Sequence, residues 1–454
     1  MATWAIVFIN ACLGIFIYFD PQIYEEFGTF LFLISLTSTL LLVIYFKDIF
    51  LYQLRILFLV VIGLIAGFVK LINPDLAFSP VGVEVQTMRI SAMMFGLTSV
   101  ALLGSSIGLA WTRSSCQIIY PSVIFNNWEP KILFYLGAPI ILLIGYLSAI
   151  SYGPSVFDSV YMSSEGEGQL LGNLQSIGII ILAMNFFSAH RIHKNKYLFL
   201  AIFLGGYFLV WGILIRGARL EFLSGLLTIF IAGQVVRGKS CAVNLRFYIF
   251  LLSLAVGAES YGYLRSTMAI ETSESFAHGY QRMYDSGVLF FGTMSGIATS
   301  FANTLDLVDV GRIKLQFGGP YWDYILRAPP HFLYPDRPLD LSSIFENYGY
   351  ASIGGFFEIA EAYLSFGLIG SFLIPFLISL IFGGIYTRAL KGSKFYFFLL
   401  LGLLSVFPRG AWYQSFAYFK ALVTAAILYL IYWLIMEYLF ATKVSGASSS
   451  QEAH

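Results

Sequence analysis

Long apolar stretches recur along the whole chain and leave few alternatives for its fold. A helix needs about 20 apolar residues to cross the hydrocarbon core of a bilayer. We expect twelve crossings, of which the third and the eleventh are short and have soft boundaries. The predicted spans are Ala2 to Tyr18, Thr29 to Phe46, Ile56 to Val69, Ile90 to Trp111, Ile132 to Tyr152, Leu170 to Ala189, Tyr197 to Ile215, Leu220 to Val236, Phe247 to Tyr263, Phe366 to Tyr386, Phe395 to Phe407 and Ala421 to Phe440.

Composition agrees with this pattern. Hydrophobic residues make up 58% of the 454 residues and charged residues 11%, and the mean hydropathy is +0.79. These values exclude a soluble globular protein and predict an all-α polytopic membrane protein. The net charge of +1 gives no sign of a polyanion partner, so we expect no binding to nucleic acid.

The charges between the spans predict the topology, because Lys and Arg favour the cytoplasmic side. Asp20, Glu25 and Glu26 form an acidic first connection, which we assign to the outside. Lys47 and Arg55 follow, and we assign them to the cytoplasm. Apart from one mixed loop, the later connections alternate in the same way. Both termini are therefore expected in the cytoplasm, with the charges at the ends of the spans.

The longest interval that does not fit in a membrane lies late in the chain, and the alternation of charge puts it on the extracytoplasmic side. A loop of this length between two membrane helices is usually functional or forms a small folded cap. The predicted division is spans one to nine in residues 1–263, the large loop in 264–365, spans ten to twelve in 366–440 and a cytoplasmic tail in 441–454.

Two arginines, Arg216 and Arg219, are predicted at an outer turn. Lys196 and Arg237 both need the cytoplasmic side, and roughly 40 residues of helix between them measure about 60 Å, which is two crossings. The turn between those crossings then falls at Arg216 to Arg219. These arginines either close the turn as anchors that reach the interface, or form a cationic site for a lipid-borne anion such as phosphate.

Other arginines repeat this pattern. Arg409 lies at the turn that the same reasoning predicts between the last two spans, beside Trp412 and Tyr413, where it is either an interfacial anchor or a second cation. Arg265 follows the ninth span and can likewise reach the interface or point inward. Arg327 lies within the long loop.

The long loop carries two further features. Prolines between Ala328 and Pro338 impose an extended backbone on a segment, or strap, that carries His331 and Arg337. The strap either contributes these residues to a site or is only a rigid connector. Glu358 and Glu361 share one face if a helix begins there. They either complement the dipole of that helix or supply a general base near the membrane surface.

We expect no metal and no cofactor. Of the five histidines only His190 and His193 are close in sequence, and basic neighbours oppose a dication there. The outer loops hold no Asp-x-Asp pair, and the chain has no glycine-rich phosphate loop followed by Lys. Any chemistry on a diphosphate must then use arginines.

These residues carry a resemblance to a family. The sequence Arg216-Gly217-Ala218-Arg219 at an outer turn, the strap from Pro329 to Pro338 in a large late loop, and Glu361 to Gly367 leading into a span resemble the Wzy-type O-antigen polymerases. The resemblance covers roughly residues 200 to 390. It implies a bacterial inner-membrane, metal-independent glycosyltransferase, similar to the GT-C type, that polymerises undecaprenyl-diphosphate-linked repeat units at the periplasmic face.

The resemblance also implies roles and partners. The partners would be the lipid-linked oligosaccharide, membrane lipid, a Wzz-type chain-length-regulating co-polymerase and a flippase. Transfer needs cations for the departing diphosphate and a base for the acceptor hydroxyl. We expect diphosphate or glycan binding by Arg216, Arg219, Arg265, Arg327, Arg337, Arg409 and Tyr363, and the base to be Glu361 or Glu358, with His331 in reserve.

Three alternatives stay open. An O-antigen ligase would use the same lipid donor but transfer the glycan to lipid A-core. A lipid-linked oligosaccharide flippase or transporter would show internal repeats and charges at the bilayer midplane, and neither is expected here. A purely structural membrane scaffold would leave the two arginines at an outer turn without a role.

Overall fold

The computed structural model describes residues 2–72, 88–116, 129–151, 167–192, 195–214, 219–236, 247–250, 292–327, 356–412 and 414–436, with a few isolated positions besides. Within these residues the regular elements are helices and no strand occurs. The helices of the first half are α1 (Ala2–Phe19), α2 (Pro21–Tyr45), α3 (Phe50–Ile72), α4 (Met88–Cys116), α5 (Glu129–Ser151), α6 (Glu167–Ile192), α7 (Asn195–Gly206), its π-helical continuation η1 (Tyr207–Leu214) and α8 (Arg219–Val236).

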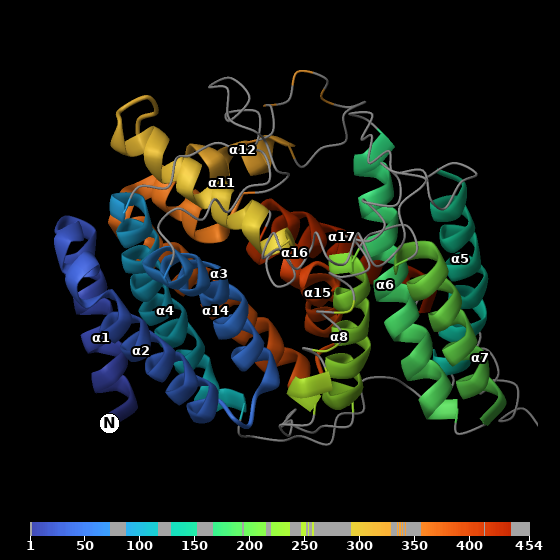
Figure 1. The fold of residues 1–454 in the computed structure, drawn as a ribbon. Helices are drawn as coiled ribbons and strands as arrows, with labels where there is room; N and C mark the ends of the chain where they lie inside the picture. The colour runs from blue at the N-terminus through green and yellow to red at the C-terminus, as the bar shows by residue number, and fades with distance from the viewer. Residues whose placement is uncertain are drawn as a thin grey trace, which may run out of the picture.

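The second half contributes helices of very different lengths. They are α11 (Gly292–Asp309), α12 (Gly319–Arg327), α14 (Glu358–Leu390), α15 (Lys394–Ser405), α16 (Phe407–Trp412) and α17 (Phe416–Trp433). The long helices run side by side as a bundle, whereas α11 and α12 lie across the end of the bundle away from the N-terminus (Figure 1). Both belong to the interval 264–365 that the sequence predicts outside the membrane.

Seven helical segments of the described residues are long and apolar enough to cross a membrane. They are Ala2–Phe19, Gln22–Tyr45, Met88–Arg113, Glu129–Ser148, Asn195–Ile213, Glu358–Leu390 and Phe416–Met436. Many large apolar side chains on their outer faces are exposed, such as Phe8, Phe30, Tyr146 and Phe203. Such a surface suits lipid rather than water. The chain is a helical membrane protein, as its composition predicts.

The number of spans, twelve, stays a prediction. Three predicted spans coincide with shorter apolar helices, Phe50–Gly63, Leu220–Val236 and Lys394–Ser405. The predicted sixth span coincides with α6, which is helical but does not reach the hydropathy of the seven. The predicted ninth span lies mostly outside the described residues.

Helix α4 forms the centre of the larger group of helices. It packs against α1, α3 and α14, and nearly all of its apolar length is buried. Glycines allow the close approach to α14, since a Cβ at Gly104 or Gly108 would collide with the backbone carbonyl oxygen of Phe372 or Phe376. Small residues bring membrane helices together in this way. This contact fixes the position of α14, on which both candidate carboxylates lie.

Helix α14 is broken near its start. Phe366 and Gly367 have non-helical backbone angles, and Gly367 has a φ of 62° that favours glycine. Arg55 contacts both Glu358 and Ser379, which are 379 − 358 = 21 residues apart and would be separated by about 32 Å in a continuous helix. The first segment, 358–365, therefore folds back beside the longer second segment.

Candidate functional site

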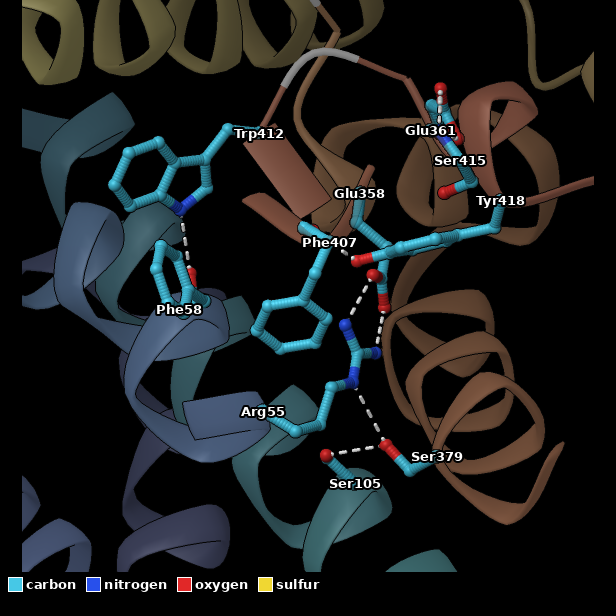
Figure 2. A network of polar contacts seen from close by, with 10 residues as sticks. All are labelled: Arg55, Phe58, Ser105, Glu358, Glu361, Ser379, Phe407, Trp412, Ser415 and Tyr418. Atoms are coloured by element: carbon cyan, nitrogen blue, oxygen red, sulfur yellow. Dashed lines mark hydrogen bonds and ion pairs between the residues drawn. The ribbon is translucent and has the colours of Figure 1, made fainter. Parts of the chain in front are cut away.

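An ion pair between Arg55 and Glu358 lies inside the bundle. Both side chains are fully buried. Nη1 of Arg55 donates to Oε2 of Glu358 at 2.6 Å, Nη2 donates to the other carboxylate oxygen, and Nε donates to the hydroxyl of Ser379 at 3.1 Å (Figure 2). All three guanidinium nitrogens are thus engaged by α14. This bidentate geometry is the strongest arrangement of an arginine and a carboxylate.

Further hydroxyls extend this network to two more helices. Ser105 on α4 and Ser379 share a hydrogen bond of 2.6 Å. The hydroxyl of Tyr418 on α17 lies beside the ion pair and donates to the carbonyl oxygen of Phe407 at 2.9 Å (Figure 2). Four helices, α3, α4, α14 and α17, therefore meet around one buried charge pair.

The assignment of Arg55 to a connection between two helices is wrong. Helix α3 begins at Phe50, so Arg55 lies one turn inside a helix and not in a loop. The error arose because the predicted third span began at Ile56, where the uninterrupted apolar run starts, whereas burial with a partner lets a helix include an arginine.

Glu361 lies one turn after Glu358 and has a different environment. It is fully buried. Its carboxylate accepts a hydrogen bond from the hydroxyl of Tyr324 and one from the backbone N–H of Ser415, at 3.1 and 3.2 Å to its two oxygens. In the part of the chain that the structure describes, Glu361 forms no ion pair. Ser415 directly precedes α17, and the N-terminal end of a helix favours a negative charge.

One face of α12 covers this carboxylate. Tyr321, Tyr324 and Arg327 are spaced by three residues, so they share a face of the helix. The ring of Tyr324 stacks on the ring of Phe416 with centroids 5.1 Å apart. The guanidinium of Arg327 also lies over the ring of Phe416. Arg327 is buried. The predicted cation of the long loop is therefore next to Glu361's own partner, Tyr324.

The hydroxyl of Tyr321 is buried without a hydrogen-bond partner among the described residues. Burial raises the pKa of Tyr321 well above its ordinary value, and the negative charges of Glu361 and Glu358 raise it further. The hydroxyl therefore stays protonated and remains a donor at neutral pH. A group of this kind is able to donate to an oxygen of a bound molecule.

An ion pair joins two helices, α8 and α16, that lie at or directly after the turns that the sequence predicts at the outer face. Arg409 on α16 forms an ion pair with Glu221 on α8, with 2.7 Å between Nη1 and Oε1. Glu221 is the third residue of α8, which begins at Arg219. The side chain of Arg409 is 48% exposed, whereas that of Glu221 is 14% exposed. Arg409 thus presents charge at the surface of the bundle near the start of α8, whose first residue is Arg219.

The short helix α16 connects this ion pair with the carboxylate site. Ser415, which binds Glu361, follows Arg409 by 415 − 409 = 6 residues. Six residues separate two Cα atoms by at most about 21 Å, and a helical path shortens that span. The backbone N–H of Gln414 also donates to the carbonyl oxygen of Arg409 at 3.3 Å. An exposed cation and a buried carboxylate thus lie in one region of the molecule.

Of the residues predicted from the sequence, Glu358, Glu361, Arg327 and Arg409 fall in this region. Tyr363 does not, because its hydroxyl shares a hydrogen bond of 3.1 Å with Tyr18 on α1. The predicted site residues outside the described part of the chain are Arg216, Arg265, His331 and Arg337, and for Arg219 only the backbone is described.

Several residues of the site were not predicted. Arg55 carried a usable signal, because a charged residue next to an apolar span often has a buried partner. Tyr324 and Ser415 carried none, since their contacts with Glu361 depend on how α12 and α17 pack.

The comparisons with known proteins do not assign a family. No protein-family model matches the chain. The comparisons with curated proteins and with solved structures also find no match.

Proposed function

We propose that this chain is a membrane glycosyltransferase that polymerises oligosaccharide repeat units carried on a polyprenyl diphosphate, such as undecaprenyl diphosphate. The single observation that carries the proposal is the connection made by α16. It joins the partly exposed Arg409 at the predicted outer turn with Ser415, which holds the carboxylate of Glu361. A cation for a diphosphate and a base for a hydroxyl are the two groups that this transfer needs close together.

In the proposed reaction the acceptor is a sugar hydroxyl of one lipid-linked unit. Its oxygen forms a bond to the anomeric carbon of the donor glycan, and the bond from that carbon to the diphosphate oxygen breaks. Glu361 takes the proton of the hydroxyl, and polyprenyl diphosphate leaves with the bonding electron pair. Arg409, with Arg216 and Arg219 at the neighbouring turn, stabilises the charge that develops on the diphosphate.

The two carboxylates have different roles in this proposal. Both oxygens of Glu358 already accept hydrogen bonds from the guanidinium of Arg55. Glu361 forms no ion pair with a described residue and accepts only from neutral donors. Glu361 is therefore the preferred base.

The site is proposed to open towards the periplasm. Helices α11 and α12 lie at the end of the bundle opposite the N-terminus of α1 (Figure 1), and the sequence predicts a cytoplasmic N-terminus. An impermeant thiol reagent should then label a cysteine introduced at Asp340 in intact cells. Labelling only after permeabilisation would exclude a periplasmic site.

A lipid-linked oligosaccharide transporter is the second candidate, because one observation favours it. Arg55 and Glu358 place charges within the helices of the bundle, as in many transporters. The partners of this pair are all side chains of the bundle itself, which is why we prefer an internal structural role for it.

The test is reconstitution of the purified protein in lipid vesicles with a defined polyprenyl-diphosphate-linked repeat unit. A polymerase forms longer lipid-linked chains and releases one polyprenyl diphosphate for each new glycosidic bond. A ligase forms no product until lipid A-core is added. A transporter moves the intact unit across the bilayer and releases no diphosphate, and that result would overturn the proposal.

A further inference from the structure

Two residues of the first segment of α14 lie beside two residues at the start of α17. Glu358 and Glu361 lie one turn apart on α14, and Ser415 and Tyr418 lie one turn apart at the start of α17. Glu361 binds the backbone of Ser415, whereas the Tyr418 hydroxyl lies beside Glu358 (Figure 2). A shift of the first segment along α17 would separate both pairs at once.

Arg55 connects the first segment of α14 to the second segment. It belongs to neither helix, yet it binds Glu358 on the first segment and Ser379 on the second segment of α14. The two segments are therefore connected at two places, covalently at the break near Gly367 and through Arg55 at Glu358, the far end of the first segment. At the other end of the first segment, the backbone N–H of Gln316 donates to the carbonyl oxygen of Leu364 at 2.9 Å.

We propose that Arg55 is a positioning residue for Glu361, holding the first segment of α14 so that the Glu361 carboxylate stays at the start of α17. This inference rests on the proposed function, in which Glu361 is the base. Arg55 contacts neither Glu361 nor a substrate in this arrangement. It acts through Glu358, one turn earlier on the same segment.

Stability alone does not explain this ion pair. Removing two charges from water costs several kcal/mol for each, and the attraction between them only partly offsets that cost. A buried pair replaced by apolar residues of similar volume is often as stable as before. An apolar pair forms no directional hydrogen bonds, whereas the bidentate contact with Arg55 fixes the position of Glu358 relative to both segments of α14.

An apolar replacement of the ion pair therefore separates a role in stability from a role in positioning. The variant that carries both Arg55→Met and Glu358→Leu removes the charges together and leaves no unpaired buried charge. In vesicles with the polyprenyl-diphosphate-linked repeat unit, it should accumulate and bind donor with an unchanged KM. Its kcat should fall about a hundredfold, because a displacement of about 1 Å at a reacting group costs that much.

A matched control comes from another arginine ion pair. Arg89 on α4 binds Asp309 on α11 through Nε and Nη2 at 2.8 and 2.7 Å, with the same bidentate geometry but an exposed arginine. The double variant Arg89→Met with Asp309→Leu should keep both kcat and KM.

A second variant covers the case in which the double variant does not accumulate. Arg55→Lys keeps the positive charge and loses the fork, so it should fold and lower kcat about tenfold at an unchanged KM, a difference worth about 1.4 kcal/mol.

Two results would overturn the inference: an unchanged kcat in these variants, or a raised KM with an unchanged kcat, which would assign the pair to donor binding. Wild-type protein that forms no polymer would instead refute the proposed function, and the inference would fall with it.

Discussion

Two pairs of arginine and glutamate in this protein have the same chemistry and opposite surroundings. Arg55 and Glu358 are fully buried and use every oxygen and nitrogen on each other and on Ser379. Arg409 and Glu221 form an ion pair in which the arginine is half exposed. Burial fixes the first pair within the fold, whereas exposure leaves the second arginine able to exchange its partner for an incoming anion. The same two residue types thus hold a carboxylate in place at one position and offer a cation at the other.

The largest expected difference between the pairs is in stability. Arg55→Ala leaves the Glu358 carboxylate buried without its partner, which typically costs about 3 to 5 kcal/mol. Arg409→Ala breaks an exposed pair and should cost about 1 kcal/mol or less. The measurement is the temperature at which the detergent-solubilised protein loses its monodisperse state. Equal shifts for the two variants would show that burial does not separate the pairs.

A smaller effect is expected on donor binding. Arg409→Ala should raise the KM for the lipid-linked donor about tenfold, because it removes a charge-assisted contact to the diphosphate. Arg409→Lys should restore part of this loss, since lysine keeps the charge and lacks the planar fork. Initial rates over a range of donor concentrations give the answer. An unchanged KM in the Ala variant would make Arg409 an interfacial anchor.

A third effect concerns Glu361 and its neighbour on α12. Tyr324→Phe removes one hydrogen bond to the carboxylate without changing the stacking on Phe416. Such a bond contributes about 1.5 to 3 kcal/mol when one partner is charged, so kcat should fall by roughly tenfold. Trp322→Phe, on the exposed face of α12, is the control and should keep the wild-type rate. Equal rates for both variants would show that Tyr324 of α12 does not contribute to the reaction.

The smallest effect is the response to salt. The Debye length falls from about 10 Å at 0.1 M salt to about 3 Å at 1 M, so the KM advantage that Arg409 gives should shrink with added salt. The stability that depends on Arg55 should not change, because buried pairs are screened much less. Repeating the KM and thermal measurements in both salt concentrations tests this contrast. A salt-dependent stability loss in Arg55→Ala would contradict it.

The sequence predicted the fold class because apolar length is a local property. Seven candidate spans follow from runs such as Ala2–Phe19 that need no knowledge of neighbours. The helical start at Glu358 was also predictable, since Glu358 and Glu361 stand at helical spacing before a span. The turn at Arg409 was placed by counting residues between basic charges, and the structure forms a short helix between α15 and α17 there.

The packing of the site was not predictable from local patterns. Glu358 and Arg55 are 303 residues apart in sequence, and Arg409 and Glu221 are 188 residues apart. No periodicity in either segment indicates the other. The fold-back at Gly367 was also missed, because a single glycine within an apolar run is common and the close approach of Gly370 to the carbonyl oxygen of Ala362 arises only in the folded chain. Tertiary contacts therefore decide which of two similar glutamates is paired and which remains available.

The most direct test of the account is the rate of polymer formation by Glu361→Gln in reconstituted vesicles. Glutamine keeps the size of the side chain and its contacts with Tyr324 and Ser415 but cannot take a proton. A general base typically contributes about 10² to 10⁴ in rate. The account predicts that this variant binds lipid-linked donor normally and forms polymer at least about a hundredfold more slowly. A normal rate would contradict it and move the role of base to another residue, with His331 the first to examine, and a defect relieved by raising the donor concentration would mean that Glu361 only binds sugar.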